Sequence, residues 1–163
     1  MNNASTPSGK LRDIALNKAS KFLGYRARTV FELTSYLRKK GTDADIIRDI
    51  IAYLTDKNYL DDLRFSRERL EYLSQYKPRS CFALRYELKK NGVPDHIIDE
   101  AVSGYDDERL ALTAARKRVG QWKGLDKADF KKKVMNFLRY RGFNYQTCMS
   151  VLSTVENDED QSI

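Results

Sequence analysis

The feature that most constrains this chain is an internal repeat. Residues 28–51 return 51 residues later as residues 79–102, with eight of 24 positions identical. A fainter third copy follows a further 50 residues along, and its matching positions are Val134, Leu138, Gly142, Val151 and Leu152. A fixed period of this length is typical of repeat architectures, in which similar units stack in series. We therefore expect about three related units.

Each copy has the pattern of two helices. In the first copy Val30, Leu33 and Leu37 recur at intervals of three and four residues, the period of one buried helix face. Thr29 and Glu32 have the spacing of a capping box at the start of this helix. No stretch sustains the alternation of a β-strand, so the pattern predicts an all-α protein.

Glycine marks the end of the first helix in each copy. Gly41, Gly92 and Gly142 occupy the position where a left-handed residue usually terminates a helix. Pro94 follows one of them and is expected at the first position of the next helix, where its missing N–H does no harm.

A further helix precedes each copy. The three preceding helices are expected to start at Asp13, at Asp61–Asp62 and at Asp106–Asp107, because acidic side chains suit the positive end of the helix dipole. Each unit is then three helices, and because repeats contact mainly their neighbours we expect an elongated molecule. The predicted divisions are a disordered arm (1–12), three repeats (13–60, 61–104 and 105–155) and an acidic disordered tail (156–163).

Composition favours a charged partner. The net charge is +7 and the isoelectric point is near 9.4, which favours nucleic acid or an acidic protein surface. Residues 1–60 carry 11 basic and 6 acidic residues, residues 61–104 carry 8 of each, and residues 105–155 carry 11 and 5. The basic charge is therefore concentrated in the first and third repeats.

Other residue types bear on packing and location. We expect the ten tyrosines and seven phenylalanines to supply much of the packing area, and Cys81 and Cys148 to be reduced core thiols. The sequence has no apolar leader and no apolar stretch of the roughly 20 residues that a membrane helix needs. We expect a cytoplasmic protein.

No enzyme constellation is present in the sequence. His96 is the only histidine and is expected to be exposed, and there is no CxxC, P-loop or GxGxxG motif. The pair Asp61–Asp62 could hold Mg²⁺, but capping of a helix start is the favoured interpretation. We therefore predict a non-enzyme with no metal site and no cofactor.

The remaining candidates for function are basic. Some of these residues precede the glycine stops, where cations also relieve the negative helix end, while the triplets within helices fit binding better. The candidate partner- or DNA-binding residues are Arg26, Arg28, Arg38, Lys39, Lys40, Lys77, Arg79, Lys89, Lys90, Arg116, Lys117, Arg118, Lys131, Lys132, Lys133, Arg139 and Arg141.

Four motifs in order resemble a known family. They are R-T-x-x-E-L-x-x-x-L-x-x-K-G (28–41), L-x-x-x-x-Y-L-D-D-x-x-F (54–65), E-L-K-K-N-G-V (87–93) and F-L-x-x-R-G-F (137–143). Together they resemble RecX, the regulatory protein that modulates the bacterial RecA recombinase.

The resemblance implies three tandem three-helix modules in an elongated, curved molecule, and it requires no chemistry of the protein itself. It implies binding in the helical groove of the RecA–single-stranded DNA filament, with inhibition or destabilisation of that filament. Recombination, DNA repair and the SOS response would be modulated in this way. A monomer with weak, non-specific affinity for single- and double-stranded DNA is expected.

Two alternatives remain open from the residues alone. A three-helix unit with a basic helix is also typical of direct nucleic-acid-binding proteins of helix-turn-helix type. A helical scaffold that binds only proteins is the second alternative. Salt dependence distinguishes them, because affinity for phosphates falls steeply with salt concentration.

Overall fold

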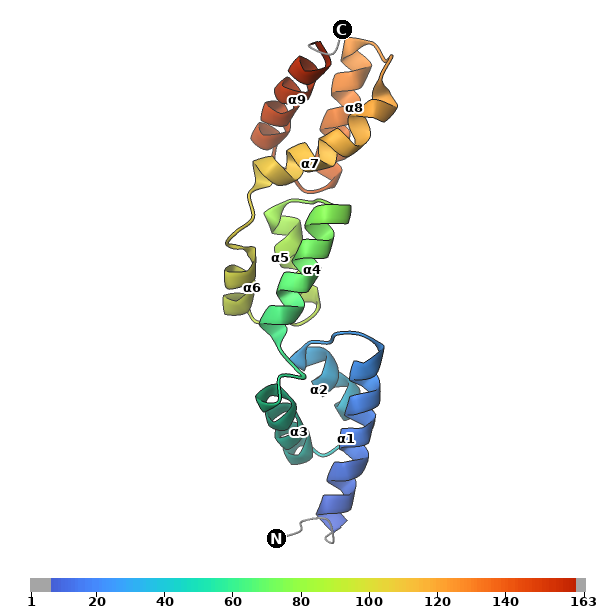
Figure 1. Ribbon diagram of the computed structural model, residues 1–163, viewed down its shortest axis with the longest axis vertical. Helices are drawn as coiled ribbons and strands as arrows, with labels where there is room; N and C mark the ends of the chain where they lie inside the picture. Colours follow the sequence, from blue (N-terminus) through green and yellow to red (C-terminus); the bar gives the residue numbers. More distant parts are fainter. Residues whose placement is uncertain (1–6, 161–163) are drawn as a thin grey trace. The chain divides into compact units, whose positions relative to one another are not determined.

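The computed structural model describes residues 7–160, and the side chains of residues 7–158. Within residues 7–160 all regular structure is helical, which confirms the all-α prediction. The elements, drawn in Figure 1, are α1 (Pro7–Tyr25), α2 (Val30–Lys39), α3 (Ala44–Asp56), α4 (Asp62–Tyr76), α5 (Cys81–Lys90), α6 (Asp95–Val102), α7 (Asp107–Val119), the short 3₁₀ helix η2 (Gly120–Trp122), α8 (Lys127–Tyr140) and α9 (Tyr145–Asp160).

These helices fall into three successive groups of three, as the repeat predicts: α1–α3, α4–α6 and α7–α9. Contacts divide the chain into two compact units. Unit 1 contains the residues up to Arg67 together with Leu88–Ile98, and unit 2 contains Glu68–Glu87 together with the residues from Asp99 onward. The division runs through all three helices of the second group, so its residues belong partly to each unit.

The core of unit 1 is aliphatic. Helix α1 packs on α2 and α3, and α2 packs on α3. Leu33 and Leu37 are wholly buried there, as the three- and four-residue spacing predicts, and so is Ile50 of α3. Truncating such a side chain to alanine typically costs about 2–5 kcal/mol of stability. In unit 2 helix α7 packs on α8 and α9 in the same way.

The predicted helix signals are present. Thr29 accepts a hydrogen bond from the Glu32 backbone N–H, and the Glu32 side chain accepts one from the Thr29 N–H, so the capping box is complete. Gly41, Gly92 and Gly142 have φ of 75°, 75° and 90°, a left-handed conformation that favours glycine. The three glycine stops are therefore confirmed.

Both outer helices extend beyond their predicted ends. Helix α1 begins at Pro7 and not at Asp13, because proline is well suited to a first helical position. The apolar spacing did not predict this earlier start, since Leu11 and Ile14 near it are exposed and belong to no buried face. Helix α9 continues to Asp160, so residues 156–160 are not a disordered tail. Asp158 in that stretch pairs with Arg116. The rest of the predicted arm and tail, residues 1–6 and 161–163, lies outside the described residues.

Pro94 precedes its helix by one residue and does not occupy the predicted first position. Helix α6 begins at Asp95, one residue after Pro94, and the Pro94 carbonyl accepts hydrogen bonds from Ile97 and Ile98. Both cysteines are free thiols, Cys148 buried and Cys81 half-buried. His96 is exposed as expected.

The expectation that aromatic side chains supply much of the packing area is wrong for tyrosine. The core consists of leucine, isoleucine, valine and alanine together with Phe65, Phe130 and Phe143, whereas most tyrosines remain at the surface because their hydroxyl groups favour water. The exposed tyrosines are Tyr25, Tyr53, Tyr59, Tyr72, Tyr76, Tyr86, Tyr140 and Tyr145. Within residues 7–160 no helix combines the length and apolar character needed to cross a membrane.

Candidate functional site

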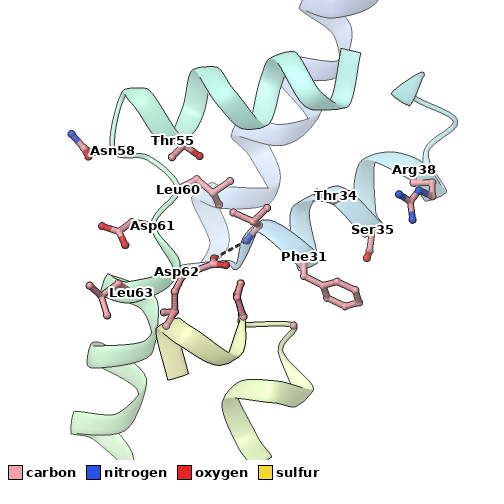
Figure 2. Close-up of a pocket in the computed structure, with 14 residues that line it drawn as sticks. Phe31, Thr34, Ser35, Arg38, Thr55, Asn58, Leu60, Asp61, Asp62 and Leu63 are labelled. Carbon is pink, nitrogen blue, oxygen red and sulfur yellow. Dashed lines mark hydrogen bonds between the residues drawn. The ribbon is translucent and has the colours of Figure 1, made fainter. Parts of the chain in front are cut away.

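The start of α2 is held by residues of the second repeat, all of them in unit 1 (Figure 2). Asp62 Oδ1 accepts a hydrogen bond of 2.8 Å from the backbone N–H of Val30. The Thr29 hydroxyl donates to the backbone carbonyl of Asn91 at 2.7 Å. Because the first N–H groups of a helix have no partner within it, Asp62 satisfies a donor that would otherwise be unpaired. We call Thr29, Val30, Asp62 and Asn91 junction 1.

The start of α5 has the same arrangement within unit 2. Asp107 Oδ1 accepts a hydrogen bond of 2.6 Å from the backbone N–H of Cys81. The Ser80 N–H donates to the backbone carbonyl of Arg141 at 3.1 Å. The Arg141 guanidinium donates to the carbonyl of Pro78 at 2.7 Å. We call Ser80, Cys81, Asp107 and Arg141 junction 2.

The repeated acidic pairs therefore have divided roles. Asp61 and Asp106 cap their own helices, since they accept hydrogen bonds of 2.9 Å from the N–H groups of Arg64 and Arg109. Asp62 and Asp107 cap α2 and α5 instead. Capping, the interpretation preferred from sequence, is confirmed for Asp61. Among the described residues no group of three or more His, Cys, Asp or Glu side chains is placed to hold a metal ion.

A glycine stop lies next to each junction and leaves no room for a side chain. A Cβ atom on Gly92 would lie 2.2 Å from Phe31 Cγ, and one on Gly142 would lie 2.6 Å from Ser80 Oγ. The same atom on Gly41 would meet nothing within 4 Å. Gly92 and Gly142 are thus required by their positive φ and by close packing in the junction.

The surroundings of the buried Asp62 carboxylate disfavour its charged form. Burial raises the pKa of its carboxyl, the hydrogen bond from Val30 lowers it, and the charges of Asp61 and Glu32 raise it again, with a net rise from the ordinary value of 3.8. A raised pKa means that the folded state binds the proton more tightly than the unfolded state. The contribution of Asp62 to stability is therefore greatest at low pH and falls as pH rises from about 3.8 through its folded pKa.

We predict opposite outcomes for two substitutions of Asp62. Asp62→Ala leaves the Val30 N–H without its acceptor, while the capping box of Thr29 and Glu32 remains, and is expected to cost about 1–2 kcal/mol. Asp62→Asn keeps an acceptor oxygen without the buried charge, so it is expected to retain most stability at neutral pH and to lose the pH dependence. Urea unfolding at several pH values between about 4 and 7 measures both. A difference between wild type and Asp62→Asn that does not vary with pH would contradict the assignment.

A cavity of about 640 Å³ lies beside junction 1 (Figure 2). Phe31 and Arg38 of α2 line one part of it, and Leu60 and Leu63 line another. Its volume is within the range of small-molecule sites, and its lining is largely apolar. Such a cavity is suited to an apolar side chain of a partner, with Arg38 and Asp61 available for polar contacts at its wall.

In unit 1 much of the candidate basic charge is compensated. Arg26 pairs with Glu32 at 2.5 Å and Arg28 reaches the same carboxylate at 3.5 Å. Burial alone would raise the pKa of Glu32, but the hydrogen bonds from Arg26 and Thr29 and the charges of Arg26 and Arg28 lower it overall. Arg28 also packs 4.1 Å above the Phe22 ring. Of the other candidates, Lys89 pairs with Asp95 at 3.2 Å, while Arg38, Lys39, Lys40 and Lys90 are exposed.

In unit 2 the candidates divide into separate groups. Arg116 pairs with Asp158 at 3.0 Å, and the Lys117 ammonium donates to the carbonyl of Gln75. Arg118 and Arg141 pack over the Phe137 ring, and Arg79 lies close enough to Arg141 for their charges to interact. The remaining candidates, Lys77, Lys131, Lys132, Lys133 and Arg139, are exposed.

The chain matches three family descriptions in order. Residues 15–54 match the first three-helix domain of RecX, residues 61–102 the second and residues 106–152 the third. The Regulatory protein RecX of Prosthecochloris aestuarii is 37% identical over 138 residues, which cover 85% of this chain and 91% of that protein. The chain belongs to the RecX family. This confirms the resemblance seen in its motifs.

Other RecX proteins extend the comparison. The Regulatory protein RecX of Chlorobaculum tepidum is 35% identical over 145 residues, which cover 89% of this chain and 90% of that protein. The crystal structure of RecX from Lactobacillus salivarius superposes with a TM-score of 0.78 at 21% identity, covering 90% of this chain and 97% of that one. The relatives are named regulatory proteins, which fits the expectation of a role without catalysis.

Sequence reasoning did not find every residue of the two junctions. Asp62 and Asp107 were read as the start of their own helices, although the recurrence of an acidic pair before both α4 and α7 was a signal of a second role. Phe137 and Trp122 were not candidates either. Their rings lie 5.5 Å apart, edge to face, beside the arginines of unit 2.

Proposed function

We propose that this RecX-family protein regulates a RecA-type recombinase by binding the recombinase–single-stranded DNA filament in its helical groove and inhibiting or destabilising it. The observation that carries the proposal is the match to all three RecX three-helix domains, in order, along most of the chain. The protein would act as a monomer in the cytoplasm and modulate recombination, DNA repair and the SOS response.

The geometry supports a binding role for unit 1. Arg38, Lys39 and Lys40 are exposed together at the end of α2, and Arg38 also lines the cavity beside junction 1. Exposed cations next to an apolar cavity are suited to a partner that offers both acidic groups and an apolar side chain. A protein filament that carries DNA offers both. Half-exposed Phe31 adds apolar area at the same place.

The proposal is tested by the DNA-dependent ATPase of the host recombinase. The full chain is expected to inhibit it at concentrations well below those at which it binds DNA alone. Replacing Arg38, Lys39 and Lys40 with glutamine is expected to weaken inhibition only several-fold, because part of that charge interacts with the negative end of helix α2 and not with the partner. A matched control replaces Lys10, Lys18 and Lys21 of α1 with glutamine and should inhibit normally.

Two outcomes would reject the proposal. If the well-folded full chain does not inhibit the recombinase, the proposed function is wrong. If the two triple variants inhibit equally, the α2 surface does not contribute to inhibition. Direct nucleic-acid binding without a recombinase, the alternative function, predicts instead that all effects of the protein follow its DNA occupancy and decline together as salt is raised.

A further inference from the structure

Arg79, Arg118 and Arg141 converge from three separate segments of unit 2. The Cζ atoms of Arg141 and Arg118 lie 4.6 Å and 5.8 Å from the centre of the same Phe137 ring. The Arg141 guanidinium donates to the carbonyl of Pro78, and the Arg141 backbone carbonyl accepts from the N–H of Ser80. Pro78 and Ser80 flank Arg79, whose charge acts on Arg141. Three guanidinium groups therefore share one small region.

These three arginines have no ion-pair partner among the carboxylates of residues 7–158, and the side-chain acceptor of Arg118 is the neutral Gln121, at 2.7 Å. Burial lowers the pKa of Arg141, and the charges of Arg79 and Arg118 lower it further, which shows that the three charges repel one another. Such repulsion is relieved by a bound anion.

The equivalent position in unit 1 shows what is missing here. Arg28 corresponds to Arg79 in the repeat, and there Glu32 neutralises the arginine. The residue that corresponds to Glu32 is Ala83. The second copy therefore keeps the arginine and replaces its carboxylate with a methyl group, so Arg79 lacks the partner that Arg28 has.

We propose that Arg79, Arg118 and Arg141 form a binding site for backbone phosphate of single-stranded nucleic acid. Guanidinium groups match the oxygen geometry of a phosphate and bind it through charge-assisted hydrogen bonds. A chain of nucleotides, and not a free phosphate ion, is favoured because exposed aromatic rings lie close by in sequence. Tyr140 precedes Arg141 and is almost fully exposed, and a base can stack on such a ring whatever its identity.

This site deepens the proposed function, on which its biological use rests, but it can be tested without a recombinase. Trp122 is the only tryptophan in the chain and its ring contacts Phe137, so its fluorescence reports on the site. Titration of the full chain with single-stranded oligothymidylate of about 20 nucleotides, at low salt, is expected to change this fluorescence to saturation.

Single substitutions then locate the binding. Arg79→Gln and Arg118→Gln are each expected to weaken binding about tenfold, the effect of one charge-assisted hydrogen bond. Each is also expected to reduce the slope of log affinity against log salt by about 0.7. The matched control is Arg116→Gln, which removes an equal charge from the same helix at a residue already paired with Asp158. Arg141→Lys keeps the charge at the position that supports Pro78, and should bind more weakly while remaining folded by circular dichroism.

Competition arms identify the ligand class. Inorganic phosphate is expected to compete only at far higher concentration than the oligonucleotide, and polyglutamate is expected to compete poorly. Equal competition by phosphate would point to a free-anion site, and equal competition by polyglutamate to an acidic protein partner; either result overturns the nucleic-acid assignment. Arg79→Gln and Arg118→Gln variants that bind like Arg116→Gln would overturn the site itself.

The ATPase assay separates this proposal from the function on which it rests. If a variant loses oligonucleotide binding but still inhibits the recombinase, the phosphate site exists but is not used in filament regulation. A protein that binds oligonucleotide through these arginines but inhibits nothing retains the site and loses the proposed function.

Discussion

In a chain that ends after Gly104, part of the second repeat is expected to unfold although only the third repeat has been removed. The truncation deletes Asp107 and Arg141, so the N–H groups of Cys81 and Ser80 at the start of α5 lose their acceptors. Residues 68–87 also lose the part of unit 2 against which they pack. A missing helix cap alone costs about 1–2 kcal/mol, and the exposed apolar surface adds to this.

This expectation departs from the simplest view of a repeat array, in which each deletion leaves its neighbours folded. The measurement is helicity by circular dichroism, together with amide hydrogen exchange at residues 81–84. We expect helicity per residue below that of residues 7–104 in the full chain, and fast exchange at the start of α5. The matched control is full-length Asp107→Ala, which removes the cap alone and should raise exchange at Cys81 with little loss of helix. Unchanged protection in the truncated chain would show that junction 2 does not stabilise α5.

The second large effect concerns the reactivity of Cys81. Burial, a hydrogen bond with Asp107 and the charges of Asp107 and Asp106 raise the pKa of this thiol from 9.0 to about 12. At pH 8 the thiolate fraction is then about 1,000-fold below that of an ordinary thiol. A more basic thiolate is intrinsically more nucleophilic, which recovers about 15- to 30-fold at a Brønsted coefficient of 0.4–0.5. Alkylation of Cys81 should therefore be about 30- to 60-fold slower in the folded chain than in urea.

Iodoacetamide labelling followed by peptide mass spectrometry measures this ratio for Cys81 separately from buried Cys148. The rate is expected to keep rising tenfold per pH unit beyond pH 9, where an ordinary thiol levels off. Asp107→Asn removes a charge next to the thiol and should speed labelling several-fold, whereas Asp129→Asn, in the first turn of α8, should not. Levelling of the rate near pH 9 in the folded chain would contradict the raised pKa.

The local signals of this fold could be predicted from the sequence because their causes are local. The capping box of Thr29 and Glu32 and the stop at Gly41 depend on residues within one or two turns of each other. The divided roles of Asp61 and Asp62 could not be predicted in this way, because Asp62 meets Val30 across 32 residues of chain. The end of helix α9 was predicted to be a disordered tail because it carries four acidic residues and no basic one. Only the pairing of Asp158 with Arg116 shows how part of that charge is accommodated.

The sequence predicted which types of residue form the candidate site, but not which of those residues lie close together in the fold. All three arginines of the proposed phosphate site were identified as basic candidates, but nothing in their spacing shows that Arg118 and Arg141 pack on Phe137 or that Arg79 lies near Arg141. One clue was available. Aligning the first two copies places Ala83 opposite Glu32, which already indicates that Arg79 lacks the partner that Arg28 has.

Junction 1 has a consequence for the order in which the protein is made. Ribosomes release the chain from its N-terminus, and Thr29 precedes its acceptor Asn91 by 62 residues. At 5–20 residues per second the interval is about 3–12 s. For about the first half of that time α2 lacks the Asp62 carboxylate at its first turn, and for all of it the Thr29 hydroxyl lacks its acceptor. The first repeat thus reaches its final form only after most of the second has been translated, and folding of the nascent chain proceeds one junction at a time.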